Sequence, residues 1–183
     1  MQYPEPIAKL IESFMKLPGI GQKTAARLAF FCLDMDEEAV RAFADALIRS
    51  KRDLHQCAIC GNITETDPCN ICSDTTRDAS IILVVENPRD VMSMEKIREY
   101  HGRYHVLNGV LSPMEGTGPE DLNIASLIKR LQDETVKEII IATNATGDGQ
   151  ATVMYLSRFT NPAVLKGKHP AYRPAVGCDL QYA

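Results

Sequence analysis

The stretch Cys57-Ala-Ile-Cys-Gly-Asn-Ile-Thr-Glu-Thr-Asp-Pro-Cys-Asn-Ile-Cys72 decides how the middle of this chain folds. It contains two Cys-x-x-Cys pairs, and each pair places two thiolates on one side of a tight turn. Two such turns that face each other supply the tetrahedral sulfur shell that Zn²⁺ prefers, with sulfur at about 2.3 Å. We therefore predict one structural zinc ion per chain, bound by Cys57, Cys60, Cys69 and Cys72.

The loop between the two pairs carries turn signals. Gly61 stands where we expect a positive φ, and Asp67-Pro68 turns the chain back towards the second pair. A segment this small has no apolar core, so metal binding must supply its folding free energy. Two disulfides are the alternative. The chain opens without an apolar signal segment, which favours a reducing cytoplasm and therefore zinc.

Composition limits the classes of function. The 183 residues are 45% hydrophobic and 24% charged, as in an ordinary globular protein, and the formal net charge is −4. A negative net charge argues against a surface that is basic everywhere, so any contact with nucleic acid must be local. Apolar runs are too short to cross a membrane. We expect a cytoplasmic, nucleoid-associated protein that makes no membrane contact.

Residues 1–54 form an all-helical segment in this interpretation, because apolar residues recur at i, i+3, i+4 and i+7. Three short amphipathic helices are expected. Their apolar faces consist of Ile7, Leu10, Ile11 and Phe14, then Ala25, Leu28, Ala29 and Cys32, then Val40, Phe43, Ala44 and Leu47.

The first two of these helices are joined by Leu17-Pro-Gly-Ile-Gly21, which resembles a helix-hairpin-helix motif. Gly19 and Gly21 allow a tight turn, and Leu17 is expected to fill the gap between the helices together with Ile20. In such motifs the backbone N–H groups of the hairpin approach a DNA phosphate. Lys23 and Arg27, four residues apart on the second helix, are expected to flank the same phosphates. A plain helical hairpin with a solvated basic face is the alternative.

The zinc module covers residues 55–78, and residues 79–183 have the sequence pattern of an α/β domain. Continuous apolar runs at 80–86, 104–107 and 136–142 indicate buried parallel strands, and helical patterns at 89–100, 122–131 and up to about 159 alternate with them. A loop at 109–119 contains three glycines and two prolines. We expect a largely parallel sheet with right-handed crossovers.

The strand that ends in Glu86, and the later stretch Thr143-Asn-Ala-Thr-Gly-Asp-Gly-Gln150, resemble a Toprim domain. Catalytic Toprim domains hold Mg²⁺ with a glutamate and two aspartates one residue apart. Those aspartates match Asn144 and Thr146 in this sequence. Loss of two carboxylates out of three removes most of the anionic oxygen that Mg²⁺ needs, so we predict that the chain is not an enzyme. A catalytic Toprim nuclease or primase-like enzyme is the alternative function.

Helix-hairpin-helix, four-cysteine zinc module and altered Toprim domain, in this order, resemble the RecR family of bacterial recombination mediators. The resemblance covers about residues 5–158. It implies a non-enzymatic clamp that forms a ring of identical chains, a dimer or tetramer, and binds single- and double-stranded DNA. It also implies that the chain works with RecO and RecF to load recombinase. A zinc-stabilised scaffold without DNA contact is a third interpretation.

Two features depart from the family pattern. Residues 160–174 contain three prolines and a glycine where family members have a strand pattern, and the sequence ends at Ala183, before the family's last strand and helix. We therefore expect an atypical, shortened C-terminal part.

Glu86 and Asp90 are assigned to partner binding. In the family this acidic edge of the Toprim domain is where RecO docks, so the resemblance implies that the negative charge of Glu86 meets a basic protein surface. For Asp90, a helix-capping role is the alternative.

Overall fold

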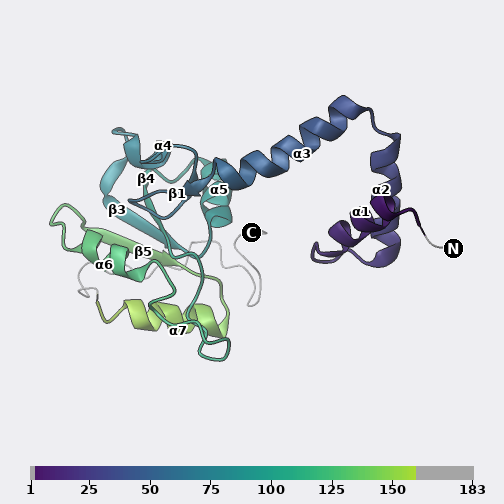
Figure 1. Ribbon diagram of the computed structural model, residues 1–183. Helices are drawn as coiled ribbons and strands as arrows, with labels where there is room; N and C mark the ends of the chain where they lie inside the picture. The colour runs from purple at the N-terminus through teal and green to yellow at the C-terminus, as the bar shows by residue number, and fades with distance from the viewer. Residues whose placement is uncertain (1–2, 160–183) are drawn as a thin grey trace. The chain divides into compact units, whose positions relative to one another are not determined.

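The computed structural model describes residues 3–159, which belong to two compact units, one up to Asp53 and one from Leu54 onward (Figure 1). The atypical segment 160–174 and the expected shortening at the C-terminus lie outside the described residues.

The first unit consists of three helices, as the periodicity predicts. They are α1 (Glu5–Met15), α2 (Gln22–Asp34) and α3 (Glu37–Arg52). Its small core is formed by Ile11 of α1 against Ala25 and Ala29 of α2, with Ile20 of the hairpin packed beside them. Because these α2 residues are small, α1 approaches α2 closely and leaves no gap for Leu17 to fill. The expectation for Leu17 is therefore wrong, and its side chain is 51% exposed.

The third helix has a clear sequence signal at its start, but it buries no residue against the rest of residues 3–159. The Asp36 side chain accepts a hydrogen bond from the backbone N–H of Ala39 at 2.7 Å, which is an N-cap of α3. None of the residues of α3 is buried, and the apolar face predicted from Val40, Phe43 and Leu47 is solvent-exposed. The amphipathic periodicity therefore predicted the helix correctly. The apolar face that it also predicted does not pack against another element of this unit.

The second unit joins the cysteine module to an α/β sheet. The module contains β1 (His55–Gln56), which pairs antiparallel with β2 (Ile63–Thr64), and the short helix α4 (Asn70–Ser73). The chain then alternates through β3 (Asp78–Val85), α5 (Pro88–Ile97), β4 (Gly102–Val106), α6 (Ile124–Leu131), β5 (Glu138–Ala142) and α7 (Gly147–Leu156).

The three strands β3, β4 and β5 form a parallel sheet in the order β4-β3-β5, as predicted for a Toprim-like α/β fold. Ile82 and Val84 of β3 pack with residues of α6 and α7, whereas Leu83 and Val85 pack on the other face with residues of α5 (Figure 1). Burial on both faces explains the continuous apolar run. Because parallel strands end at one edge, residues that follow β3 and β5 meet there.

Candidate metal centre and nucleic-acid interface

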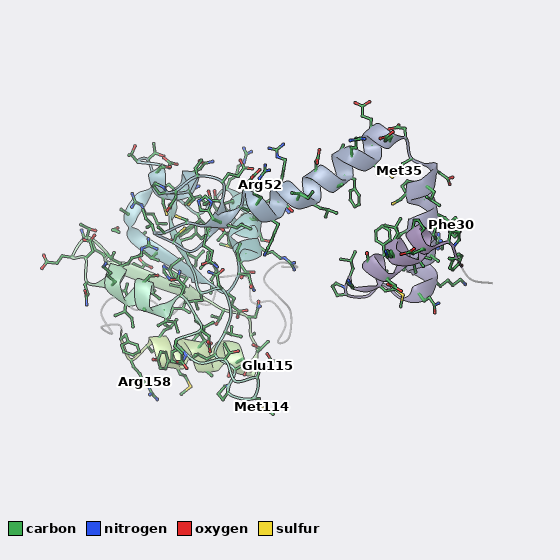
Figure 2. All side chains as sticks on the ribbon, in the orientation of Figure 1. Phe30, Met35, Arg52, Met114, Glu115 and Arg158 are labelled. Atoms are coloured by element: carbon green, nitrogen blue, oxygen red, sulfur yellow. The ribbon has the colours of Figure 1, made fainter. Side chains whose placement is uncertain are left out.

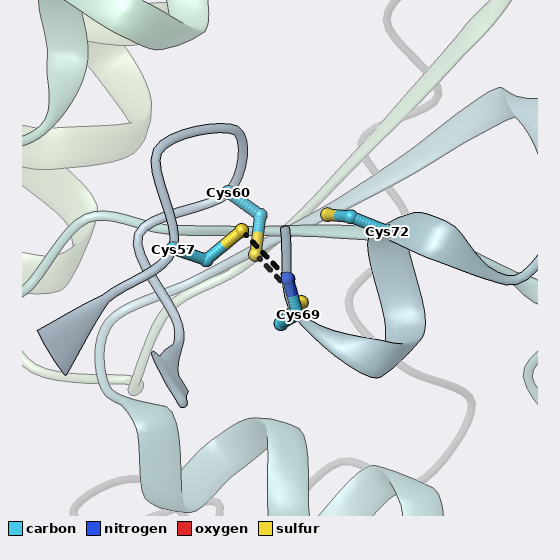
Figure 3. Close-up of side chains that lie close together, drawn as sticks. All are labelled: Cys57, Cys60, Cys69 and Cys72. Atoms are coloured by element: carbon cyan, nitrogen blue, oxygen red, sulfur yellow. Dashed lines mark hydrogen bonds between the residues drawn. The ribbon is translucent and has the colours of Figure 1, made fainter. Parts of the chain in front are cut away.

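The four cysteines of the module converge on one point. Their sulfur atoms all lie within 4.8 Å of one another, and all four residues are buried (Figure 3). The Sγ atoms of Cys60 and Cys69 are 3.6 Å apart. A tetrahedral zinc centre with Zn–S distances of about 2.3 Å has sulfur–sulfur separations of about 3.8 Å. The donor set and its spacing therefore fit a Zn²⁺ ion.

Electrostatics of the thiols also favours a bound cation. The neighbouring Cys72 and burial raise the pKa of the Cys60 thiol far above its usual range. Burial also acts to raise the pKa of the Cys57 thiol, but backbone N–H groups, of which that of Cys69 has the largest effect, outweigh it and lower this pKa. Four buried thiolates repel one another, and a divalent cation removes this penalty because it binds the deprotonated form.

The module is anchored to the sheet at the free edge of β4. The N–H of Val106 donates to the carbonyl of Cys60 at 2.7 Å, and the Asn108 side chain donates to the carbonyl of Gly61 at 3.2 Å. Gly61 has φ +73°, as predicted, and a Cβ there would lie 2.8 Å from the carbonyl oxygen of Val106. The glycine is needed both for the turn and for this close approach.

The hairpin between α1 and α2 leaves room for a ligand. Gly19 has φ +78°, which only glycine adopts without strain, whereas Gly21 is the N-cap of α2 and has φ −84°. No side chain caps α2, and a Cβ at Gly21 would meet no atom within 4 Å. The backbone at the start of α2 is therefore approachable from outside.

Lys23 and Arg27 lie on the exposed surface of α2, as expected. Together with Phe30, which is 45% exposed and labelled in Figure 2, they line a hollow between α1 and α2. Two cations one helical turn apart beside an accessible helix N-terminus are an arrangement suited to phosphate.

At the carboxyl edge of the sheet, Glu86 and Asn144 form a tight pair. The backbone N–H of Asn144 donates to Oε1 of Glu86 at 2.6 Å, and its Nδ2 donates to Oε2 at 2.8 Å. Glu86 is only 5% exposed. The hydroxyl of Thr146 accepts from the N–H of Gly149 and caps α7. Both residues that replace the metal-binding aspartates therefore have structural roles.

The Glu86 carboxylate is buried and turned towards Asn144, whose backbone and side-chain N–H groups both donate to it. Asp90 is buried as well, and its Oδ2 accepts from the N–H of Asn87 at 2.8 Å as half of a capping box at the start of α5. The capping alternative for Asp90 is thus the arrangement observed.

Within residues 3–159, only the four cysteines form a group of three or more His, Cys, Asp or Glu side chains whose ligand atoms lie close enough to bind one metal ion. No helix in the same range has the length and apolar character required to span a bilayer.

Comparison with known proteins agrees with this architecture. The sequence matches the family models of the RecR helix-hairpin-helix over residues 7–50, the RecR four-cysteine zinc finger domain over 54–74 and the Toprim domain over 80–173. Recombination protein RecR of Enterococcus faecalis is 71% identical over 183 residues, which are 100% of this chain and 92% of that protein. The proteins of the same name from Levilactobacillus brevis and Latilactobacillus sakei are 65% and 64% identical, with the same shares covered.

The chain belongs to the RecR family. Zinc is its structural cofactor, held by the four cysteines of the family's zinc finger, and recombinational DNA repair is its cellular role. As a RecR protein it carries a Toprim domain. Glu86, Asn144 and Thr146 stand at the three positions that the resemblance matches to the metal ligands of catalytic Toprim domains.

Two polar residues of this RecR chain were assigned no role from the sequence. His105 is fully buried, and its Nε2 lies 2.7 Å from the carbonyl oxygen of Asn123. Arg130 contacts the other ring nitrogen of His105. In the sequence, a basic residue at the end of a helix indicates only a favourable interaction with the helix dipole.

Proposed function

We propose that this protein is a non-enzymatic DNA-binding clamp that works with RecO and RecF to load recombinase during repair. The observation that carries the non-enzymatic part is the Glu86–Asn144 pair. Two N–H donors occupy the carboxylate that would otherwise bind Mg²⁺, and Thr146 caps a helix instead of supplying a ligand. Metal-dependent DNA cleavage by the purified protein would contradict this assignment.

DNA contact is assigned to the hairpin of the first unit. Gly19 and Gly21 expose backbone N–H groups at the start of α2, and Lys23 and Arg27 add two positive charges on the same helix. Such contacts involve phosphate and not base edges, so binding should be independent of sequence and available to single- and double-stranded DNA.

The test is the double variant Lys23→Ala/Arg27→Ala in the full-length chain. Loss of two phosphate contacts should weaken binding on every DNA sequence and reduce the slope of log K against log salt by about 2 units on duplex DNA. The matched control is Arg41→Ala/Arg49→Ala on α3, which removes the same charge from residues paired with Glu37 and Asp53. Equal affinities of the two double variants across salt concentrations would contradict the assignment of the hairpin.

Partner binding is assigned to the sheet edge that contains Glu86 and Asp90. Since both side chains are buried, their contribution would be to hold the surrounding surface and its negative field in place. Glu86→Gln keeps the shape of the side chain and removes its charge. We expect weaker RecO binding at an unchanged zinc content. Unaltered RecO affinity in the folded variant would move the interface elsewhere.

A closed ring of identical chains, a dimer or tetramer, is the proposed assembly, and the cytoplasm around the nucleoid is its proposed location. The exposed apolar residues Phe31, Leu33, Phe43 and Leu47 of α2 and α3 support self-association of the helical unit. The mass in solution, measured with and without DNA, tests this. A strictly monomeric protein at all concentrations would argue against a clamp.

A further inference from the structure

Arg130 is held at the boundary between the sheet and the cysteine module. It lies in the last turn of α6 and is half-buried. Its Nη1 donates to the carbonyl of Tyr104 at 2.8 Å and lies 3.1 Å from Nδ1 of His105. These contacts fix the guanidinium beside strand β4.

The hydrogen bonds of β4 show on which side of the strand Arg130 lies. The N–H of Leu107 donates to the carbonyl of Val85 in β3, whereas the N–H of Val106 donates to the carbonyl of Cys60. Backbone groups alternate along a strand, so the carbonyl of Tyr104 points to the same free edge as the N–H of Val106. Arg130 and the first cysteine turn therefore occupy neighbouring positions along one edge.

A positive charge at this edge would stabilise a four-cysteine zinc centre. Four thiolates around Zn²⁺ carry a net charge of −2, and burial of uncompensated charge is costly. Burial lowers the pKa of the Arg130 guanidinium, and the groups that most strongly oppose this are Cys72 and Cys60, followed by Cys57. The cysteine sulfurs therefore favour the charged form of Arg130.

We propose that Arg130 is the counter-charge of the zinc centre, a positioning residue on the β4 edge that offsets the net negative charge of the tetrathiolate.

His105 keeps the guanidinium in this orientation. Arg130 has only N–H donors, so Nδ1 of His105 must accept, and Nε2 then carries the proton and donates to the carbonyl of Asn123 at 2.7 Å. The Asn123 side chain in turn donates to the carbonyl of Val106 at 3.1 Å. A neutral imidazole supports the arginine without cancelling its charge, which leaves that charge available to the zinc centre.

The experiment compares Arg130→Gln and Arg130→Lys with the control Lys129→Gln in the full-length protein. Gln retains a donor for the Tyr104 carbonyl but has no charge, Lys retains the charge, and Lys129 is an exposed neighbour on the same helix. Zinc affinity is measured by competition with a chromophoric chelator at fixed pH. Co²⁺ substitution checks spectroscopically that the four-sulfur geometry is kept.

Arg130→Gln should weaken zinc binding roughly 10- to 100-fold, the range typical of residues that surround metal ligands, while Arg130→Lys stays within a few-fold of the parent and Lys129→Gln is unchanged. Equal zinc affinity in Arg130→Gln and Lys129→Gln would overturn the proposal. If Arg130→Gln does not fold, Arg130→Lys decides. Retained zinc affinity in this variant supports a role for charge, and a loss of tenfold or more contradicts it.

Discussion

Asn144 stands where a catalytic Toprim domain has a metal-binding aspartate, and its two N–H donors bind the carboxylate of Glu86. One residue thus supplies, with its backbone N–H and its side-chain amide, the partners that a buried carboxylate requires. These contacts link the ends of β3 and β5, so Asn144 stabilises the junction between the two strands. In the non-enzymatic function proposed above, the same residue stands in place of a magnesium ligand.

Reversal of this replacement should be destabilising. Asn144→Asp removes the donor that lies 2.8 Å from Oε2 of Glu86 and places a second carboxylate there, so we expect the free energy of unfolding at pH 7 to fall by about 2–4 kcal/mol. Urea unfolding measures the change. The control is Gln150→Glu, the same amide-to-carboxylate change at an exposed position of α7. Equal stability of the two variants would show that the pair contributes little.

His105 makes stability depend on pH. Burial lowers the pKa of this imidazole from 6.5 to about 4. Between these values the unfolded chain binds more protons than the folded chain, so the free energy of unfolding falls as the pH falls through this range. Between pH 7 and pH 5 this residue should contribute a loss of about 2 kcal/mol.

The measurement is urea unfolding of the parent and of His105→Asn at both pH values. Because the zinc thiolates also take up protons in acid, the test is the difference between the two proteins, and the variant should show the shallower pH dependence. Parallel pH profiles would contradict a buried neutral His105.

At the scale of elements, the hairpin before α2 uses two glycines for two different reasons. Gly19 is required by its backbone conformation, whereas Gly21 has an ordinary conformation and open space around it. One glycine serves the fold, and the other leaves the start of α2 uncovered.

Two alanine substitutions separate these roles. Gly19→Ala should lower the free energy of unfolding of the helical unit by about 1 kcal/mol or more, because a Cβ is strained at φ +78°. Gly21→Ala should leave stability nearly unchanged and weaken DNA binding, since the added methyl group stands in the path of a phosphate. Thermal unfolding and DNA titration are measured on both variants. A destabilised Gly21→Ala protein, or one with full DNA affinity, would contradict this division.

At the scale of the second unit as a whole, the cysteine module also protects a sheet edge. Among the described strands β4 is an outer one, and the carbonyl of Cys60 accepts from the N–H of Val106 on the side away from β3. An unpaired edge invites association with other chains. Zinc therefore affects more than residues 55–78, because the turn that it fixes covers part of the α/β sheet.

Removal of zinc by a chelator should unfold the module and expose this edge. We expect one zinc per chain in elemental analysis of the freshly purified protein. After chelation the amide of Val106 should exchange with solvent at least tenfold faster, a change of about 1.4 kcal/mol in its protection. The amide of Leu107, which pairs with β3, is the internal control. Unchanged exchange at Val106 in the metal-free protein would show that the module folds without metal.

Local pattern predicted much of this protein. Spacing of Cys57, Cys60, Cys69 and Cys72 indicated zinc because short Cys-x-x-Cys turns fix ligand geometry within a few residues. Periodicity identified the helices and the buried strands, because burial on one or both faces leaves its period in the sequence. The positive φ at Gly61 was predicted from its place after the first cysteine pair.

Long-range contacts decided the remainder. Glu86 is bound by Asn144, which is 58 residues away in the sequence. This contact forms because the parallel strands β3 and β5 end at one edge of the sheet. The contact of Arg130 with the edge of β4 likewise depends on how α6 lies against that strand, and nothing in its local sequence distinguishes it from a helix-terminal cation. The metal ligands, the long helices, the buried strands and the family could be read from local patterns, whereas the short elements β1, β2 and α4 were not predicted. Which charges are buried, and what neutralises them, follows only from the folded chain, because it depends on distances between residues far apart in the sequence.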